Sequence, residues 1–166
     1  VEYCHQRNKK VYITVNIFAH NDDIAALPDY LKDLNDIRPD ALLISDPGVM
    51  MLAKEYAPNV PIHISTQANN VSLETAKFWA KNGAKRIILA RELSRDKIKY
   101  IMENKDPDLE MEMFIHGAVC MGYSGRCLLS NYFTGRASNH GDCAQPCRWK
   151  YNVYIDERYV GNFEEW

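Results

Sequence analysis

The sequence predicts an α/β fold built on a parallel sheet. Five strand-sized segments, rich in apolar and β-branched residues, start about 20 to 30 residues apart. A segment with helical character fills each gap between them. Regular alternation of strands and helices is the signature of parallel α/β proteins.

The five predicted strands are mostly apolar along their whole length. Strands that are covered by helices on both faces of a parallel sheet have this composition. His63 lies inside the third strand, so we expect it to pack within the sheet. In chain order the strands are 11–18 (VYITVNIF), 41–46 (ALLISD), 61–66 (PIHIST), 86–90 (RIILA) and 110–117 (EMEMFIHG).

Four helices are predicted between the strands, from apolar spacing and from capping residues. Asp22 is expected to cap the first helix, and Pro28 is expected to kink or split it. Ser72 suits the start of the third helix and Gly83 its end, while Ser94 suits the start of the fourth. The helices are 22–37, 48–58, 72–83 and 94–105.

Two arrangements of parallel strands fit this pattern, an open doubly wound sheet and a (β/α) barrel. The dinucleotide-binding pattern GxGxxG does not follow the first strand, and no phosphate loop occurs. A complete barrel needs eight units and about 250 residues. This chain has 166 residues, begins with Val1 and stops without a boundary signal. We therefore predict a partial (β/α) barrel of the TIM type, in a piece of a longer protein.

The chain is predicted to divide into three parts. Residues 1–119 form the partial barrel. Residues 120–151 form a cysteine-rich segment that packs on the barrel mouth. Residues 152–166 begin a short antiparallel hairpin, because WKYNVYIDERYVGNF alternates in polarity around a turn-like DER.

The composition is that of an ordinary globular domain, with 46% hydrophobic and 25% charged residues. No apolar run approaches the roughly 18 residues of a membrane span, so we expect no membrane partner. Five cysteines, an odd number, argue against a framework of disulfides alone, and we expect a reducing, cytoplasmic location. The net charge is −2, yet residues 120–151 hold four basic residues and one acidic residue. That local excess suggests an anionic partner.

Polar residues follow all five predicted strands at the point where each ends. The carboxyl ends of parallel strands meet at one edge of a sheet, where active sites lie. We therefore predict a pocket at this edge. Capping of the next helix is the alternative role for each residue taken singly. The predicted pocket residues are Asn16, His20, Asn21, Asp22, Ser45, Asp46, Ser65, Thr66, Gln67, Arg91, Glu92 and His116.

Four cysteines cluster in the segment 120–151 with six, fifteen and three residues between them: Cys120, Cys127, Cys143 and Cys147. The last gap suits a zinc knuckle, whereas the wider first gap and the nearby glycines favour an iron–sulfur cluster. Disulfide bonds or unligated thiols would also be compatible with this spacing. Cys4 precedes the first strand and is expected to be a small buried residue.

Basic and aromatic residues alternate in the same segment. Rings that stack beside guanidinium groups suit single-stranded RNA or an anionic small molecule, and the alternative is a solvated loop over buried rings. The protease patterns GxSxG and HExxH are absent. A thiol nucleophile made of Cys120 or Cys127 with His116 is a further option. The alternating residues are Tyr123, Arg126, Tyr132, Phe133, Arg136, Arg148, Trp149 and Tyr151.

Several stretches resemble the collagenase-like peptidase family, number thirty-two of the U peptidases. They include VYITVNIFAHNDD, ALLISDPGVM, PIHISTQANN and, above all, FIHGAVCMGYSGRCLLSNYFTGRASNHGDCAQPCRWKY. The resemblance runs from about residue 9 to residue 151. It implies a (β/α) barrel that continues on both sides of this chain.

The resemblance implies an enzyme that hydroxylates RNA, because the GDCAQPCRWKY block is similar to that branch of the family. The implied substrates are a tRNA wobble uridine or a ribosomal RNA cytidine, with a small anionic donor such as prephenate. Two further readings are a collagenase-like peptidase and a cluster-bearing protein that serves a partner without activity of its own.

The resemblance also implies a [4Fe-4S] cluster, with zinc as the alternative metal. By motif position its ligands would be Cys120, Cys127, Cys143 and Cys147. The implied catalytic residues are His116, Arg91 and Glu92. The implied substrate-binding residues are Asn16, Asp46, Gln67, Arg126, Arg136 and Arg148, of which the arginines would hold a carboxylate or a phosphate.

Overall fold

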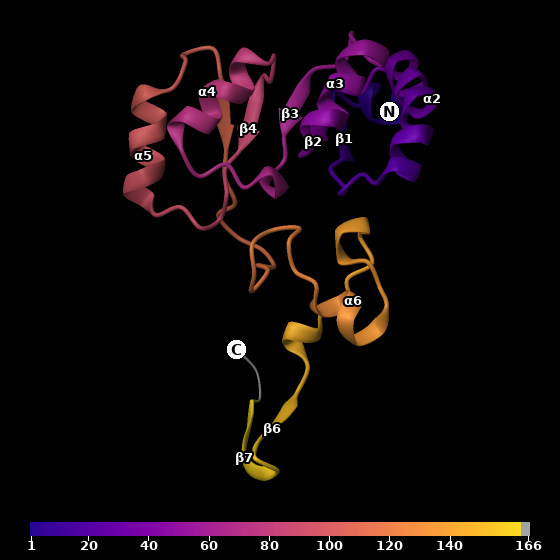
Figure 1. The fold of residues 1–166 in the computed structure, drawn as a ribbon. Helices are drawn as coiled ribbons and strands as arrows, with labels where there is room; N and C mark the ends of the chain where they lie inside the picture. The colour runs from indigo at the N-terminus through magenta and orange to yellow at the C-terminus, as the bar shows by residue number, and fades with distance from the viewer. Residues whose placement is uncertain (164–166) are drawn as a thin grey trace. The chain divides into compact units, whose positions relative to one another are not determined.

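A computed structural model of the protein describes residues 1–163 (Figure 1). The described residues form two compact units, the first spanning Val1–Ser124 and the second beginning at Gly125. The first unit contains a five-stranded sheet and the second a two-stranded sheet. The division falls inside the predicted cysteine-rich segment, so Cys120 belongs to the first unit and the other three cysteines of that segment to the second.

The sheet of the first unit is wholly parallel, and each strand pairs with the strand that follows it in the chain. A doubly wound sheet would instead reverse its strand order at a switch point. The observed order is sequential and has no such reversal, and the predicted α/β class with a parallel sheet is confirmed. The strands are β1 (Tyr12–Val15), β2 (Ala41–Ile44), β3 (Ile62–Ile64), β4 (Arg86–Ile88) and β5 (Glu110–Glu112).

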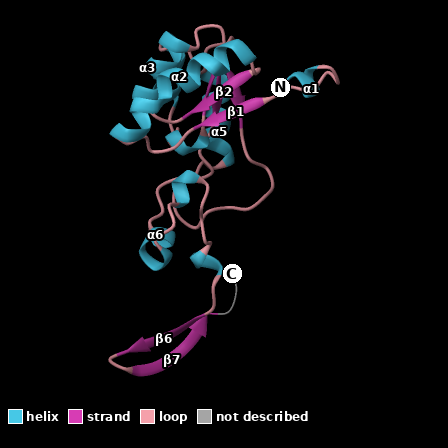
Figure 2. Cartoon of the chain, turned by 90° about the vertical axis from the view of Figure 1, so that its right-hand side faces the viewer, coloured by secondary structure: helices cyan, strands magenta, loops and turns pink. Residues whose placement is uncertain are grey.

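Helices connect the strands, and with right-handed crossovers a sequential strand order places them all on one face. Figure 2 shows α2 and α3 on the same side of β1 and β2. In chain order the helices of this unit are α1 (Glu2–His5), α2 (Asn21–Ile37), α3 (Pro47–Tyr56), the 3₁₀ turn η1 (Thr66–Ala68), α4 (Leu73–Lys81) and α5 (Arg95–Asn104).

The hydrophobic core lies between the sheet and these helices. One face of the sheet presents only apolar side chains to it, because alternate residues of a strand point the same way. The helices each contribute an apolar stripe, which includes Leu31 of α2 and Ile101 of α5, both buried. The buried strand residues of this face are Val15, Leu42, Ile44, Ile62, Ile64 and Ile87, and Leu89 directly after β4 joins the same core.

The helix starts follow the predicted capping chemistry with one exception. Asp46, Ser72 and Ser94 each accept a hydrogen bond from the backbone N–H three residues on. The predicted cap Asp22 is wrong, because α2 begins earlier with His20 as its N-cap and the Asp23 carboxylate accepts from the His20 N–H at 2.9 Å. The helix also continues unbroken through Pro28.

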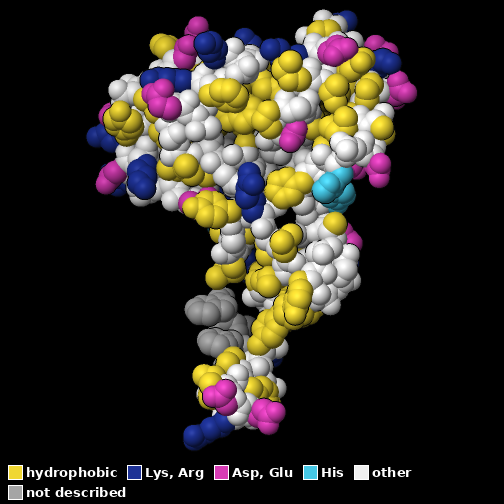
Figure 3. All heavy atoms as spheres, viewed as in Figure 1, with side chains coloured by type: hydrophobic (Ala, Val, Ile, Leu, Met, Phe, Trp, Pro, Cys, Tyr) yellow, Lys and Arg dark blue, Asp and Glu magenta, His cyan; other side chains and the backbone are white. Residues whose placement is uncertain are grey.

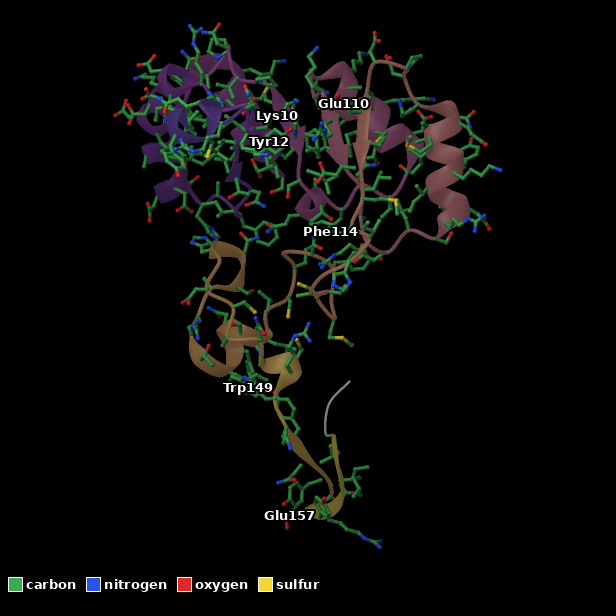
Figure 4. The ribbon with its side chains drawn as sticks, turned by 180° about the vertical axis from the view of Figure 1, so that it is seen from behind. Lys10, Tyr12, Glu110, Phe114, Trp149 and Glu157 are labelled. Atoms are coloured by element: carbon green, nitrogen blue, oxygen red, sulfur yellow. The ribbon has the colours of Figure 1, made fainter. Side chains whose placement is uncertain are left out.

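The opposite face of the sheet is polar near the amino ends of the strands. Arg86 of β4 pairs with Glu110 at 2.6 Å and with Glu112 at 3.2 Å. The ring of Tyr12 lies 5.2 Å from that of His63, which is buried as predicted. Figure 4 shows Lys10, Tyr12 and Glu110 together at this end of the sheet and Phe114 at the other.

Two predictions at the ends of the first unit are wrong. The sequence predicts a fifth strand over 110–117, but β5 ends at Glu112 because β4 offers ladder partners only as far as that residue. The segment beyond it leaves the sheet, and Ile115 is 88% exposed. Cys4 is half-buried rather than buried, because the single turn of α1 contributes no buried residue.

The second unit consists of short helical turns followed by the predicted hairpin. Asp156 and Glu157 form its two-residue turn, both with positive φ (47° and 63°), the backbone of a type I′ turn. The last three residues of the predicted hairpin segment, 164–166, lie outside the described residues. The elements are α6 (Leu129–Thr134), η2 (Ser138–His140), η3 (Pro146–Arg148), β6 (Tyr151–Ile155) and β7 (Arg158–Phe163).

No helix in the described part of the chain is long and apolar enough to cross a membrane. Lys and Arg side chains are interspersed with Asp and Glu over the surface of the first unit (Figure 3).

Candidate functional site

The carboxyl edge of the sheet carries a network of polar side chains from three neighbouring strands. The Asn16 side-chain amide donates to the Ser65 hydroxyl at 3.1 Å. The Ser45 hydroxyl donates to the Asn16 carbonyl at 2.9 Å. The predicted meeting of strand ends is thus present where β1, β2 and β3 end, and it is held by direct hydrogen bonds.

Asp46 and Gln67 stand at the same edge, each at the start of a helical element. The Asp46 carboxylate accepts from the Val49 N–H at 2.9 Å and so caps α3. The Gln67 N–H donates to the Ser65 hydroxyl at 3.2 Å, at the start of η1. The capping role that the sequence leaves open therefore holds for Asp46, whose carboxylate is already occupied by a backbone donor.

Arg91 follows β4 and binds the segment that leads away from β5. Its guanidinium donates to the Ala118 carbonyl at 3.3 Å and to the Ser124 hydroxyl. The group also lies over the Phe114 ring, 5.7 Å from the ring centre. Among the described residues its buried Nε has no hydrogen-bond partner.

Asn69 reaches the same segment from the end of η1. Its side-chain amide donates to the Ser124 carbonyl at 3.5 Å, and Ser124 is only 3% exposed. Arg91 and Asn69 together fix residues 118–124, a stretch that contains Cys120. Sequence reasoning missed Asn69 and Ser124, because both act through the path of a loop rather than through a motif.

A pocket beside Arg91 is lined by the residues that follow β5, from Phe114 to Val119. Both His116 and Arg91 line this pocket, as the sequence predicts for the carboxyl edge of the sheet. Glu92 is exposed and does not line the pocket. The fifth strand ends before His116, so this side chain lies in the loop and not at a strand end.

All five cysteines are free thiols. Cys120 and Cys143 are exposed, whereas Cys127 and Cys147 are half-buried. The Gln145 N–H donates to the Cys143 sulfur at 3.3 Å, and Gln145 has a positive φ of 56°. Backbone donors of this kind stabilise a thiolate and are a feature of iron–sulfur ligands.

The loops that carry the second unit's cysteines are tied by side-chain hydrogen bonds. The Ser138 hydroxyl donates to the Cys127 carbonyl at 2.9 Å. The Ala144 N–H donates to the Ser130 hydroxyl at 3.0 Å, next to Cys143, and Ser130 is fully buried. These contacts hold the backbone at Cys127 and directly after Cys143.

Within the described residues, no three His, Cys, Asp or Glu side chains gather as a metal site. Cys120 belongs to one unit and Cys127, Cys143 and Cys147 to the other. The chemistry of this donor set, four reduced thiols with a backbone donor to one sulfur, fits an iron–sulfur cluster.

Of the three predicted substrate-binding arginines, Arg136 has a defined partner in Asp142. Two guanidinium nitrogens approach one carboxylate oxygen at 2.7 Å and 2.9 Å. This hydrogen bond from Arg136 holds the pKa of Asp142 below its ordinary value. Arg126 and Arg148 are also engaged in contacts within the protein.

Comparison with known proteins gives a family and named relatives. The model of peptidase family U32 matches residues 1–165. The tRNA hydroxylation protein P of Escherichia coli K12 is 49% identical over 98% of this chain and 36% of its own length. The 23S rRNA 5-hydroxycytidine C2501 synthase of the same organism is 37% identical over 99% of this chain and 24% of its own length.

The solved structure of the U32 peptidase Mk0906 matches with a TM-score of 0.55 and 20% identity, over 68% of this chain and 48% of its own. That likeness supports the fold. The chain spans about a third or less of the length of the two curated relatives.

Proposed function

The chain belongs to peptidase family U32, and on that basis we propose that the full-length protein is an iron–sulfur RNA hydroxylase. The observation that carries this proposal is the 49% identity, across 98% of the chain, to a protein named for tRNA hydroxylation. The rRNA hydroxycytidine synthase, related over 99% of the chain, supports the same reaction class. A tRNA wobble uridine is the proposed target base.

The proposed cluster is [4Fe-4S], with Cys120, Cys127, Cys143 and Cys147 as its ligands and zinc as the alternative metal. An iron–sulfur cluster supplies one-electron transfer when it is bound. Hydroxylation replaces a C–H bond of the base by C–OH and removes two electrons from it. A small anionic donor such as prephenate would supply the hydroxyl oxygen and accept those two electrons, so that the donor is reduced as the base is oxidised, and the hydrogen of the C–H bond would leave as a proton.

The remaining predicted residues have proposed roles within this scheme. At the carboxyl edge, Asn16 and Gln67 would contact the substrate, and His116 and Glu92 would hold or move a proton. Arg126, Arg136 and Arg148 would contact RNA phosphates through charge-assisted hydrogen bonds. The sequential strand order supports a closed (β/α) barrel, completed by strands outside this chain.

The first test measures iron, acid-labile sulfide and the visible spectrum of the full-length protein purified without oxygen. We expect about four of each per chain, the content of one [4Fe-4S] cluster. The Cys120→Ala and Cys143→Ala variants should lose the iron and the visible absorption. Cys4→Ala is the matched control, because this thiol lies outside the cysteine-rich segment, and it should keep both.

Nucleoside analysis of RNA from cells that lack the protein then tests the reaction. Loss of one hydroxylated pyrimidine that returns with the wild-type gene supports the hydroxylase. Peptide cleavage by a protein without metal would contradict it and favour a peptidase. A bound cluster without any change in cellular RNA would favour a protein that serves a partner.

A further inference from the structure

A cluster of aromatic rings stands on the second unit. Phe133 of α6 is at its centre, with ring centres of Tyr132, Trp149 and Tyr151 at 5.1, 6.2 and 6.0 Å. Trp149 directly follows η3 and Tyr151 begins β6, so three elements contribute to it. The Tyr151 hydroxyl donates to the Pro146 carbonyl at 2.8 Å and ties β6 to η3. We call these four side chains the aromatic cluster.

The aromatic cluster is exposed to an extent that is unusual for packed rings. Tyr132 is 81% exposed, Phe133 48% and Trp149 42%. Aromatic side chains contribute most when they are covered, so rings that touch one another and still face solvent mark a binding surface. Figure 4 shows Trp149 beside the short helical elements of this unit.

The charges next to the aromatic cluster indicate what it binds. Arg148 and Lys150 flank Trp149 in the chain, and Arg136 follows α6 by two residues. The segment 125–151 contains one acidic residue, Asp142, and its side chain pairs with Arg136. Exposed rings beside cations are the arrangement with which proteins hold single-stranded nucleic acid: the rings stack on bases and the cations meet phosphates.

We propose that the aromatic cluster is a stacking platform for unpaired bases of an RNA loop. This inference rests on the proposed function, because it supplies the surface by which a hydroxylase would hold its RNA. Tyr132, Phe133 and Trp149 offer exposed ring surface. Phe133 contacts each of the other three rings, and Tyr151 ties the cluster to η3 through its hydroxyl group. An apolar segment of polypeptide would match the rings but not the cations around them.

Binding of a fluorescently labelled oligouridine by the full-length protein tests this platform. Loss of one stacked base contact weakens binding on the order of 10-fold or more. We expect that loss in Tyr132→Ala and in Trp149→Ala, and near-normal binding in Tyr132→Phe and Trp149→Phe, which keep a ring. Tyr154→Ala is the matched control, because Tyr154 is an exposed aromatic residue of the same unit outside the aromatic cluster.

Salt dependence separates stacking from charge. The rings carry no charge, so the ring-to-alanine variants should weaken binding without changing its dependence on salt concentration. Arg148→Ala should instead lower the slope of that dependence. Duplex RNA of the same length should bind equally to wild type and ring variants, since its bases are not free to stack on the protein.

Two results would overturn the platform. One is oligouridine binding that is unchanged in both alanine variants. The other is a Trp149 that acrylamide cannot quench in the RNA-free protein, which would mean that another part of the polypeptide covers the rings. Loss of binding in both variants, in a protein whose absence changes no cellular nucleoside, would keep the platform and remove the hydroxylase. Unchanged oligouridine binding in both alanine variants, in a protein whose absence does remove a hydroxylated nucleoside, would keep the hydroxylase and remove the platform.

Discussion

At the scale of single residues, Arg91 is the clearest departure from the role that its position suggests. A basic residue at the carboxyl end of a strand is expected to hold a substrate. Its two terminal nitrogens instead donate to Ala118 and Ser124 of the same unit. The geometry is that of a residue that positions the loop with Cys120, and the catalytic role implied for Arg91 stays a prediction.

Arg91→Lys should loosen that loop. Lysine lacks the planar fork that reaches both acceptors, and each lost hydrogen bond costs about 1 kcal/mol. We expect amide hydrogen exchange in residues 114–124 to become roughly 5 to 10 times faster for a loss of that size. Mass spectrometry of the metal-free full-length protein measures this. Arg95→Lys, an exposed change at the start of α5, should leave exchange in this segment unaltered; equal rates in the two variants would refute the positioning role.

The burial of His63 leads to a prediction about the pH dependence of stability. Burial, and then the charge of Arg86, lowers the pKa of His63 below its ordinary value of about 6.5. The folded state therefore favours the neutral form of the His63 imidazole. Its contribution to stability is complete above pH 6.5 and is lost as the pH falls from there through the lowered pKa. The charged groups that face it are Arg86, Glu110, Glu112 and Lys10.

His63→Gln should consequently flatten the pH dependence of stability below about pH 6.5. Thermal unfolding between about pH 7.5 and pH 5 measures it, in a window above the range in which most carboxylates titrate. We expect the melting temperature of the wild type to fall more steeply than that of the variant. His140→Gln changes an exposed histidine and should retain the wild-type slope. A variant that is as pH-sensitive as the wild type would show that His63 is not the responsible group.

At the scale of elements, the turn of the hairpin stores strain that one substitution should release. Glu157 adopts a φ of 63°, a left-handed backbone that costs a side-chain-bearing residue about 1 kcal/mol or more and suits glycine. Glu157→Gly should therefore stabilise the pairing of β6 with β7 by about 1 kcal/mol. Slower hydrogen exchange of the β6 and β7 amides would report this gain. Glu157→Ala keeps the strain and should not slow exchange.

The elements themselves were predictable because their signals are local. Apolar runs located four strands and the start of the fifth, and Ser72 and Ser94 cap helices as expected. The length of β5 was not predictable in the same way, since a strand extends only as far as its neighbour offers hydrogen-bond partners. The continuity of α2 through Pro28 could not be predicted from local signals either. Packing of Leu27 and Leu31 on either side of Pro28 offsets the hydrogen bond that proline removes.

At the scale of the whole molecule, the strand order is sequential and lacks the reversal of a doubly wound sheet. Parallel topology predicts that Asn16 and the residues after β3 meet, and they do. The clamp by Arg91 and Asn69 could not be foreseen, because it depends on where the chain travels after β5. The row of Tyr12, His63 and Arg86 likewise depends on register, which sets the face that each residue occupies.

The two outer strands of the sheet have a practical consequence. In the described part of the chain, β1 and β5 each pair on one side only. The outer edges of β1 and β5 present backbone amide and carbonyl groups without a strand partner, and such edge strands can pair with further strands. Strands from outside this chain or from a second copy of it would satisfy those groups. A polypeptide of residues 1–166 that is produced alone at high concentration should therefore self-associate through the edges of β1 and β5.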